Sequence, residues 1–356
     1  MKKISMKRLL SFLLLLAFIT SAIATGCSSK PANSANSAEA GNKESKKEDT
    51  IVIKLGHHHN VDGVVDLYCK KFAELAGTKS NGRIRVDVYP GAQLGQEFEA
   101  AEGILMGTQQ MSGVSTTAYN NLVKGFGLDM LPFMFDSYES IMNVFTNSPV
   151  GEELESRFLK QNGRILGWIA LGGRHMIFTD KDIKSVSQMK GMKMRSPESD
   201  LFVGMFNALG CRPTPITWGE TYTALQTNVV DGMESPTTSM KDMKFYEVAK
   251  YCLLTNHMWG TFNLVINEGF FQSLPQDIRQ IIIDSGKEAS VYANKVSQEE
   301  EKKSIDFLKE KGMVFHELSE EDAVIMRASI EPVIDKWGKD HGAVELIKML
   351  REEIKK

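Results

Sequence analysis

Residues 192–216, "MKMRSPESDLFVGMFNALGCRPTPI", decide the fold class because they predict a strand, a helix and a second strand in immediate succession. Apolar residues between 200 and 210 recur at helical spacing, and Gly210 closes this predicted helix. The chain continues with a second helix at 220–228 and a third strand at 229–235. Strands that alternate with helices are typical of α/β domains.

An earlier segment repeats this alternation. It predicts strands and helices in the order β-α-β-α-β at 51–56, 66–77, 83–90, 97–107 and 109–116. Two such units predict two α/β lobes, each built on a sheet flanked by helices. A helical pattern without internal proline runs from 275 to about 312, and at 1.5 Å per residue this helix would be roughly 50 Å long. A helix of that length would brace both lobes.

The order of the elements suggests where the lobes divide. Two stretches with strand-like patterns, 164–173 and 257–271, separate the units and predict crossings from one lobe to the other. We therefore expect lobe I to comprise 51–172 plus 261–300, and lobe II to comprise 173–260 plus 301–356. In the tail, Ser319 and Asp322 have capping-box spacing and predict a helix start.

The N-terminal residues indicate export. Four basic residues precede the apolar run Leu9 to Ile23, which is shorter than a membrane span and ends in small residues before Cys27. This pattern predicts a signal peptide at 1–26 and lipid attachment at Cys27, with plain secretion as the alternative. Residues 27–50 are polar, lack aromatic residues and are expected to form a disordered tether.

Charge and cysteine content narrow the function. Removal of the signal peptide leaves 38 basic against 45 acidic residues, a net charge of −7, which disfavours nucleic-acid binding. Cys69, Cys211 and Cys252 lack metal-ligand spacing and are expected to be buried free thiols, with one disulfide left open.

Two arginines follow predicted strands, where ligands bind in open α/β sheets. Arg195 ends the strand at 192–195 and precedes Ser196 and Pro197, which predict a helix start and hence a site favourable to anions. Arg174 follows the apolar strand at 164–173. An ordinary surface arginine at 195 and a turn arginine at 174 are the alternatives.

Two further polar clusters follow predicted strands. Hydroxyl groups at Ser235, Thr237 and Thr238 follow the strand at 229–235, and a turn that caps the next helix is the alternative. In "HHHN" (57–60), neighbouring side chains on a strand face opposite ways, so at most the first and third histidines would converge. We therefore expect no metal site there.

The motifs of common enzyme classes are absent from the sequence. It contains no P-loop, no GxGxxG after a strand, no HExxH and no GxSxG. We therefore expect neither catalysis nor a cofactor.

Several longer stretches together resemble solute-binding proteins of the tripartite ATP-independent periplasmic (TRAP) transporters, of the dicarboxylate-binding (DctP) type. They are "NGRIRVDVYPGAQLGQEFEAAEGILMG" (81–107), "GGRHMIF" (172–178), "MKGMKMRSPES" (189–199), "ALGCRPTPITWGETYTALQTNVVDGMESP" (208–236) and "LPQDIRQII" (274–282). The resemblance implies a two-lobed periplasmic-binding-protein-like fold with a long helix spanning both lobes. It also implies that Arg195 forms a bidentate pair with the substrate carboxylate and that Arg174 assists, while Ser235 replaces an asparagine common in the family.

The resemblance further implies a lipid-anchored extracytoplasmic protein that captures an organic acid and delivers it to TRAP permease subunits. The acid would be a C4-dicarboxylate or a sugar acid such as a uronate. A sensory binding protein for a membrane receptor and an extracellular enzyme acting on a small acid are the alternatives. Beyond the two arginines and the three hydroxyl residues above, the expected cleft walls are His58, Asn60, Glu99, Trp218, Phe262 and Asn263.

Overall fold

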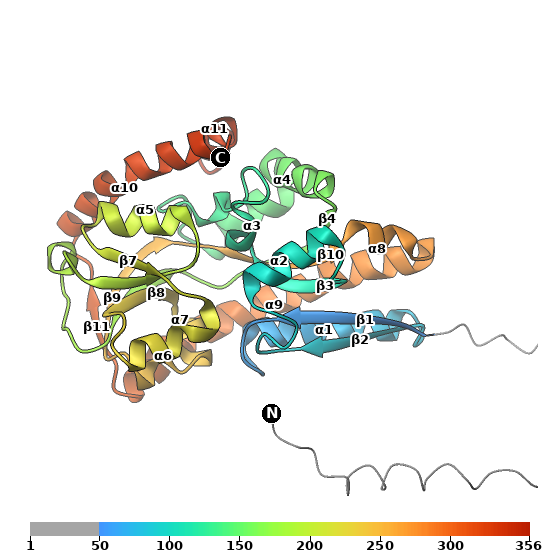
Figure 1. The fold of residues 1–356 in the computed structure, drawn as a ribbon, viewed down its shortest axis with the longest axis horizontal. Helices are drawn as coiled ribbons and strands as arrows, with labels where there is room; N and C mark the ends of the chain where they lie inside the picture. The colour runs from blue at the N-terminus through green and yellow to red at the C-terminus, as the bar shows by residue number, and fades with distance from the viewer. Residues whose placement is uncertain (1–49) are drawn as a thin grey trace, which may run out of the picture. The chain divides into compact units, whose positions relative to one another are not determined.

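The computed structural model describes residues 50–356, which contain two mixed β-sheets flanked by helices (Figure 1). In the first sheet, β1 is parallel to β2 and β3, whereas β10 is antiparallel to β3 and β4. The strand order is β2-β1-β3-β10-β4, with bounds Ile84–Tyr89, Ile51–His57, Met111–Ser115, Thr261–Asn267 and Gly163–Ala170.

The second sheet is also mixed. Strand β5 is antiparallel to β8 and β9, whereas β6 is parallel to β7 and β8. The strand order is β11-β9-β5-β8-β6-β7, with bounds Val314–Glu317, Tyr251–Met258, Arg174–Phe178, Gly232–Pro236, Lys193–Ser196 and Arg212–Pro215. The predicted α/β class with two sheets is confirmed.

Helices flank both sheets, and most of them follow from the apolar periodicity of the sequence. The patterns predicted α1, α2, α5, α6, α9 and the start of α10 but not α3 or α4, whose segment connects the two repeated units. The bounds of α1 to α11 are Val64–Lys79, Glu97–Met106, Tyr138–Asn147, Pro149–Lys160, Asp200–Ala208, Thr221–Gln226, Thr237–Asp242, Glu268–Ser273, Gln276–Glu310, Glu320–Asp340 and Val344–Glu353.

Helix α9 runs unbroken for 35 residues, as its proline-free pattern predicted. It packs against α1 and β4 beside the first sheet and against α7, which follows the second sheet. Close approach to β4 requires a small residue, because a Cβ atom on Gly286 would lie 2.5 Å from the Leu166 carbonyl oxygen. The expectation of a long helix that spans both lobes is confirmed.

The chain crosses between the sheets three times, after β4, before β10 and along α9, which leads from β10 to β11. The first crossing contains Gly172, whose φ of +97° is a conformation that other residues rarely adopt. The two sheets are therefore joined by two short connections and one continuous helix. The lobe boundaries stay a prediction, and α11 of the tail, assigned to lobe II, packs against α4 of lobe I.

Local details confirm some expectations and correct one. The Ser319 hydroxyl accepts a hydrogen bond from Asp322 N at 3.1 Å and caps α10. The helix start predicted at Ser196 was wrong, because Ser196 ends β6 and α5 begins at Asp200 after the N-cap residue Ser199. Cys69, Cys211 and Cys252 are buried and free, as expected.

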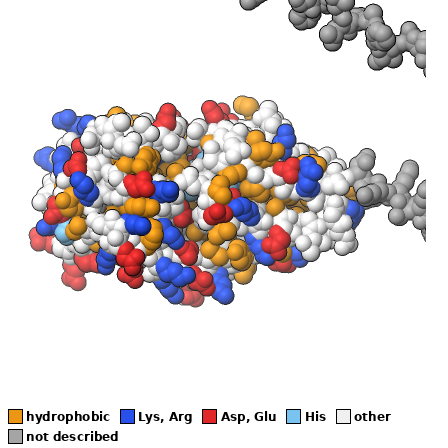
Figure 2. Space-filling view, turned by 90° about the horizontal axis from the view of Figure 1, so that it is seen from below, with side chains coloured by type: hydrophobic (Ala, Val, Ile, Leu, Met, Phe, Trp, Pro, Cys, Tyr) orange, Lys and Arg blue, Asp and Glu red, His pale blue; other side chains and the backbone are white. Residues whose placement is uncertain are grey.

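Among residues 50–356, no helix is long and apolar enough to cross a membrane. The predicted signal peptide, the tether at 27–50 apart from its last residue, and Cys27 lie outside the described residues. On the face seen in Figure 2, acidic and basic side chains are interspersed rather than gathered into one basic region.

Candidate functional site

A cavity lies where segments of the two sheets meet. The first sheet and its helices contribute the turn after β1, the start of α2 and residues of β3 and β10. The second contributes the start of β5, β6, the turn before α6 and the β8–α7 junction. The lining residues are His58, His59, Glu97, Ser115, Thr117, Met130, Leu171, Gly172, Arg174, Arg195, Pro197, Phe202, Trp218, Pro236, Ser239, Gly260, Thr261 and Phe262.

Arg195 is a buried cation in this cavity, with only 3% of its surface exposed. Its Nε donates to the Ile216 carbonyl oxygen at 2.9 Å, and its guanidinium lies 5.5 Å from the centre of the Trp218 ring. No hydrogen bond or ion pair joins its two terminal nitrogens to another residue within 50–356. Burial lowers the pKa of Arg195 to about 10, so the side chain remains charged at neutral pH.

Arg174 lines the same cavity but already has an acidic partner. It begins β5 rather than lying in a turn, and its guanidinium binds Glu234 of β8 in a bidentate ion pair, with Nη2 to Oε1 at 2.8 Å. Glu234 is fully buried. Its pKa is lowered although burial alone would raise it, because the charge and hydrogen bonds of Arg174 stabilise the carboxylate.

The opposite wall carries a second carboxylate and two neutral histidines. Glu97 Oε1 accepts from the main-chain N (2.8 Å) and hydroxyl (2.6 Å) of Ser115, and its Oε2 lies 3.7 Å from His58 Nε2. Burial raises the pKa of Glu97 and lowers the pKa of His58 to about 3, so His58 is neutral. His59 packs against Trp218 and Phe262.

The comparison with known proteins is consistent with this geometry. A family model described as bacterial extracellular solute-binding protein, family 7, matches residues 55–340. The chain belongs to this family.

Two kinds of relatives stand out among the solute-binding proteins that resemble this chain. The C4-dicarboxylate-binding periplasmic protein DctP of Rhodobacter capsulatus is 32% identical over 82% of this chain and 88% of its own length. The sugar acid binding protein of Advenella mimigardefordensis, solved with galactonate, is 25% identical with a TM-score of 0.83, covering 86% of this chain and 98% of that chain. A TRAP solute-binding protein of Roseobacter denitrificans with bound L-galactonate is 27% identical with a TM-score of 0.78, covering 86% and 99%.

Family membership establishes the function class. Family 7 consists of bacterial extracellular solute-binding proteins, and the two solved structures above hold sugar acids. The cavity is therefore the candidate ligand site of this solute-binding protein. Within the described residues, no three His, Cys, Asp or Glu side chains are grouped so as to hold a metal ion.

Five of the eleven residues predicted for the cleft line the cavity. Arg195, Arg174, Trp218, His58 and Phe262 line it. Four others are buried in the structure but do not line the cavity: Ser235, Thr237, Thr238 and Asn263. Thr238 Oγ1 donates to the Leu171 carbonyl oxygen at 2.8 Å and so holds the first crossing.

Two residues predicted as cavity walls lie elsewhere. Glu99 is exposed, and its carboxylate accepts from Gln96 N at 2.9 Å to close the capping box of α2. Asn60 donates from Nδ2 to the Asp242 carbonyl oxygen at 3.0 Å. Glu97, two residues before Glu99, takes the expected place, because residues two apart on a helix point in different directions.

The expectation that His57 and His59 were the only pair of these histidines that could converge was also wrong. Strand β1 ends at His57, so the alternation of side chains does not continue into the turn that follows. His57 Nε2 lies 3.1 Å from Asp66 Oδ1 beneath α1, whereas the rings of His58 and His59 lie side by side with centres 4.6 Å apart. The sequence did not identify His59, Glu97 or Glu234 as residues of this site. His59 lies in the turn after β1, Glu97 begins α2, and Glu234 lies on β8.

Proposed function

We propose that this protein captures a monocarboxylic acid with several hydroxyl groups, such as an aldonate or a uronate, and delivers it to a TRAP-type membrane permease. One observation supports this most directly: the cavity has one guanidinium without an acidic partner, that of Arg195, and a carboxylate, that of Glu97, on the opposite wall.

Arg195 would bind the substrate carboxylate. A guanidinium offers parallel N–H groups that match the two oxygens of a carboxylate, and it remains charged at neutral pH. Arg174 adds positive potential nearby, but its Nε and Nη2 groups already donate to Glu234 in the bidentate pair. The cavity therefore suits one carboxylate better than two.

Glu97 and its neighbours would bind hydroxyl groups. A carboxylate oxygen accepts from a hydroxyl, whereas a second substrate carboxylate beside Glu97 would meet a like charge. His58 Nδ1 and Trp218 Nε1 are buried without a hydrogen-bond partner among the described residues, and buried polar atoms are normally paired. These groups favour a hydroxylated acid over a C4-dicarboxylate, the ligand named for the Rhodobacter relative.

A ligand panel tests this proposal. Ligand-free protein would be titrated with galactonate, gluconate, galacturonate, glucuronate, succinate, malate and fumarate by calorimetry and by thermal unfolding. Ligand at about 1,000 times its dissociation constant adds about 4 kcal/mol to the unfolding free energy, which is a readily measured shift. We expect the hydroxylated acids to shift the midpoint and the C4-dicarboxylates to bind at least tenfold more weakly. Binding of succinate alone would contradict the proposal.

We also propose lipid anchoring through Cys27, supported by the basic residues, apolar run and small residues before it. A single acyl chain gives marginal membrane binding, whereas two or more anchor stably. Replacement of the cysteine by Ser (Cys27→Ser) in the full-length protein should therefore move the product from the membrane fraction to the soluble one. Retention in the membrane fraction would contradict this attachment.

A further inference from the structure

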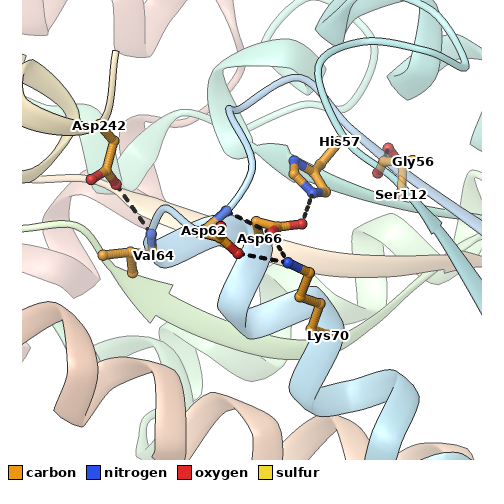
Figure 3. A network of polar contacts seen from close by, with 8 residues as sticks. All are labelled: Gly56, His57, Asp62, Val64, Asp66, Lys70, Ser112 and Asp242. Carbon is orange, nitrogen blue, oxygen red and sulfur yellow. Dashed lines mark hydrogen bonds and ion pairs between the residues drawn. The ribbon is translucent and has the colours of Figure 1, made fainter. Parts of the chain in front are cut away.

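Helix α1 begins without a capping side chain of its own. Its N-cap residue is Gly63, and the first free N–H, that of Val64, donates instead to Asp242 Oδ2 at 3.1 Å (Figure 3). Asp242 is the last residue of α7, 178 positions away. Asn60, just before α1, donates from Nδ2 to the main-chain oxygen of the same residue at 3.0 Å.

Glycine at the N-cap position leaves room for this distant carboxylate. N-cap residues are usually Ser, Thr, Asp or Asn, whose side-chain oxygen accepts from the first turn. A Cβ atom on Gly63 would lie 2.6 Å from Asp242 Oδ2, so any larger residue would displace the carboxylate. The lack of a side chain at Gly63 therefore makes room for the carboxylate of Asp242, which accepts the hydrogen bond.

The turn that contacts Asp242 is held in place by several polar contacts of Asp66. Asp66 Oδ2 accepts from Asp62 N at 2.7 Å and pairs with Lys70 Nζ at 2.7 Å, while its Oδ1 contacts His57 (Figure 3). On the other side, Lys241 forms an ion pair with Glu300 of α9. The turn is thus positioned by its own lobe, whereas α7 is tied to α9, the helix that packs beside both sheets.

The contact joins the two lobes beside the ligand cavity. The turn after β1 belongs to the first sheet and supplies His58 and His59 to the cavity, whereas the β8–α7 junction belongs to the second and supplies Pro236 and Ser239. Hydrogen bonds from Asn60 and Val64 to Asp242 therefore require that the lobes be close together.

We propose that Asp242 is an interlobe latch, which caps α1 when the lobes close around the ligand and so strengthens binding without touching it. This inference rests on the proposed function, because closure serves capture of the acid. When the lobes separate, water would replace the carboxyl oxygen at Val64 N. The apparent affinity depends on the population of the closed form, so loss of the latch weakens binding at a distance.

The hydrogen bond and the charge of Asp242 are separable contributions to the latch. Burial raises the pKa of Asp242 to about 6, which shows that desolvation offsets the benefit of its charge near Val64 N–H and Lys241, while Glu300 opposes that charge. Asparagine has the same shape and retains an acceptor oxygen. It therefore separates the hydrogen bond from the charge.

The test measures acid binding and dissociation rate in three single variants of the mature protein. Asp242→Ala should weaken binding of the acid chosen by the panel about tenfold, mainly through faster dissociation, a size expected for loss of a helix cap. Asp242→Asn should remain within about threefold of wild type. Asp306→Ala, which alters an exposed aspartate on α9, is the matched control and should leave binding unchanged.

A double variant separates a latch from a simple helix cap. Gly63 has φ −76°, which serine adopts freely, so Gly63→Ser in the Asp242→Ala background gives α1 a local cap whether the lobes are open or closed. For a latch, the unfolding midpoint recovers but binding stays about tenfold weak. Full recovery of binding would overturn the latch, as would wild-type affinity in Asp242→Ala. If the wild-type protein binds none of the acids, the proposed function itself fails.

Discussion

Arg195 and Arg174 lie on two strands of one sheet and line one cavity, yet their surroundings differ. Arg174 forms a bidentate pair with a buried carboxylate, whereas Arg195 gives one N–H to a carbonyl oxygen and has no acidic partner among the described residues. A buried cation with its own carboxylate is satisfied within the fold. One without such a carboxylate gains from an anionic ligand, so the difference supports a structural role for Arg174 and the proposed ligand-binding role for Arg195.

The register of the sheet explains this difference. Strand β8, which carries Glu234, lies between β5 and β6. In the antiparallel pair β5–β8, Arg174 is opposite Pro236 and Met176 is opposite Glu234, so the arginine and the glutamate are diagonal neighbours on one face. In the parallel pair β6–β8, Met194 is opposite Gly232. Arg195, one residue further, therefore faces away from Glu234.

The largest expected effect is on stability, from Arg174→Ala. This change leaves Glu234 buried without its partner and should lower the unfolding free energy of the ligand-free protein by about 3 kcal/mol or more, measured by urea denaturation. Removing both charges, in Arg174→Met with Glu234→Met, should restore most of the loss. A loss below about 1 kcal/mol in the single variant would show that the pair is not structural.

Arg195→Ala should have the opposite profile. Affinity for the acid should fall at least about thirtyfold, because a buried ion pair with the ligand is lost. The ligand-free protein should be as stable as wild type or more stable, since a buried charge without an acidic partner is removed. Calorimetry and urea denaturation measure the two effects. Unchanged affinity would end the proposed role of Arg195.

Arg195→Lys tests geometry against charge. Lysine retains the positive charge but lacks the planar fork, so we expect affinity about tenfold weaker than wild type. The measurement is the dissociation constant of the same acid in buffers of equal ionic strength. Affinity equal to wild type would mean that the arginine supplies only positive potential, as we infer for Arg174.

The smallest expected effect concerns the opposite wall. Glu97→Gln removes the negative charge but keeps polar atoms near Ser115 and His58, so binding of a sugar acid should weaken by only a few-fold. Binding of succinate should improve by a similar factor, because like-charge repulsion is removed. Paired titrations with both acids give the ratio of their two dissociation constants. A ratio equal to that of wild type would exclude Glu97 from selecting the ligand.

Local patterns in the sequence predicted most of the secondary structure and identified both arginines that line the cavity. Alternating and helical periodicities located the strands of both units, and the absence of proline predicted α9, because these features depend on neighbours along the chain. The segment before β4 was less informative, and α3 and α4 were not predicted. The helix start at Ser196 was wrong since β6 continues through that residue. Local capping signals do not show how far a strand pairs with its neighbour.

The sequence by itself determined the fold class, the family and the two candidate cations, because strand and helix periods and the longer motifs are properties of contiguous residues. Only the tertiary structure decided that Glu234 forms an ion pair with Arg174, that Glu97 rather than Glu99 faces the cavity, and that Asp242 caps α1. These contacts join residues 18 to 178 positions apart. These contacts depend on the register of the sheet and on the approach of the two lobes. The spacing of residues within one short segment reveals neither.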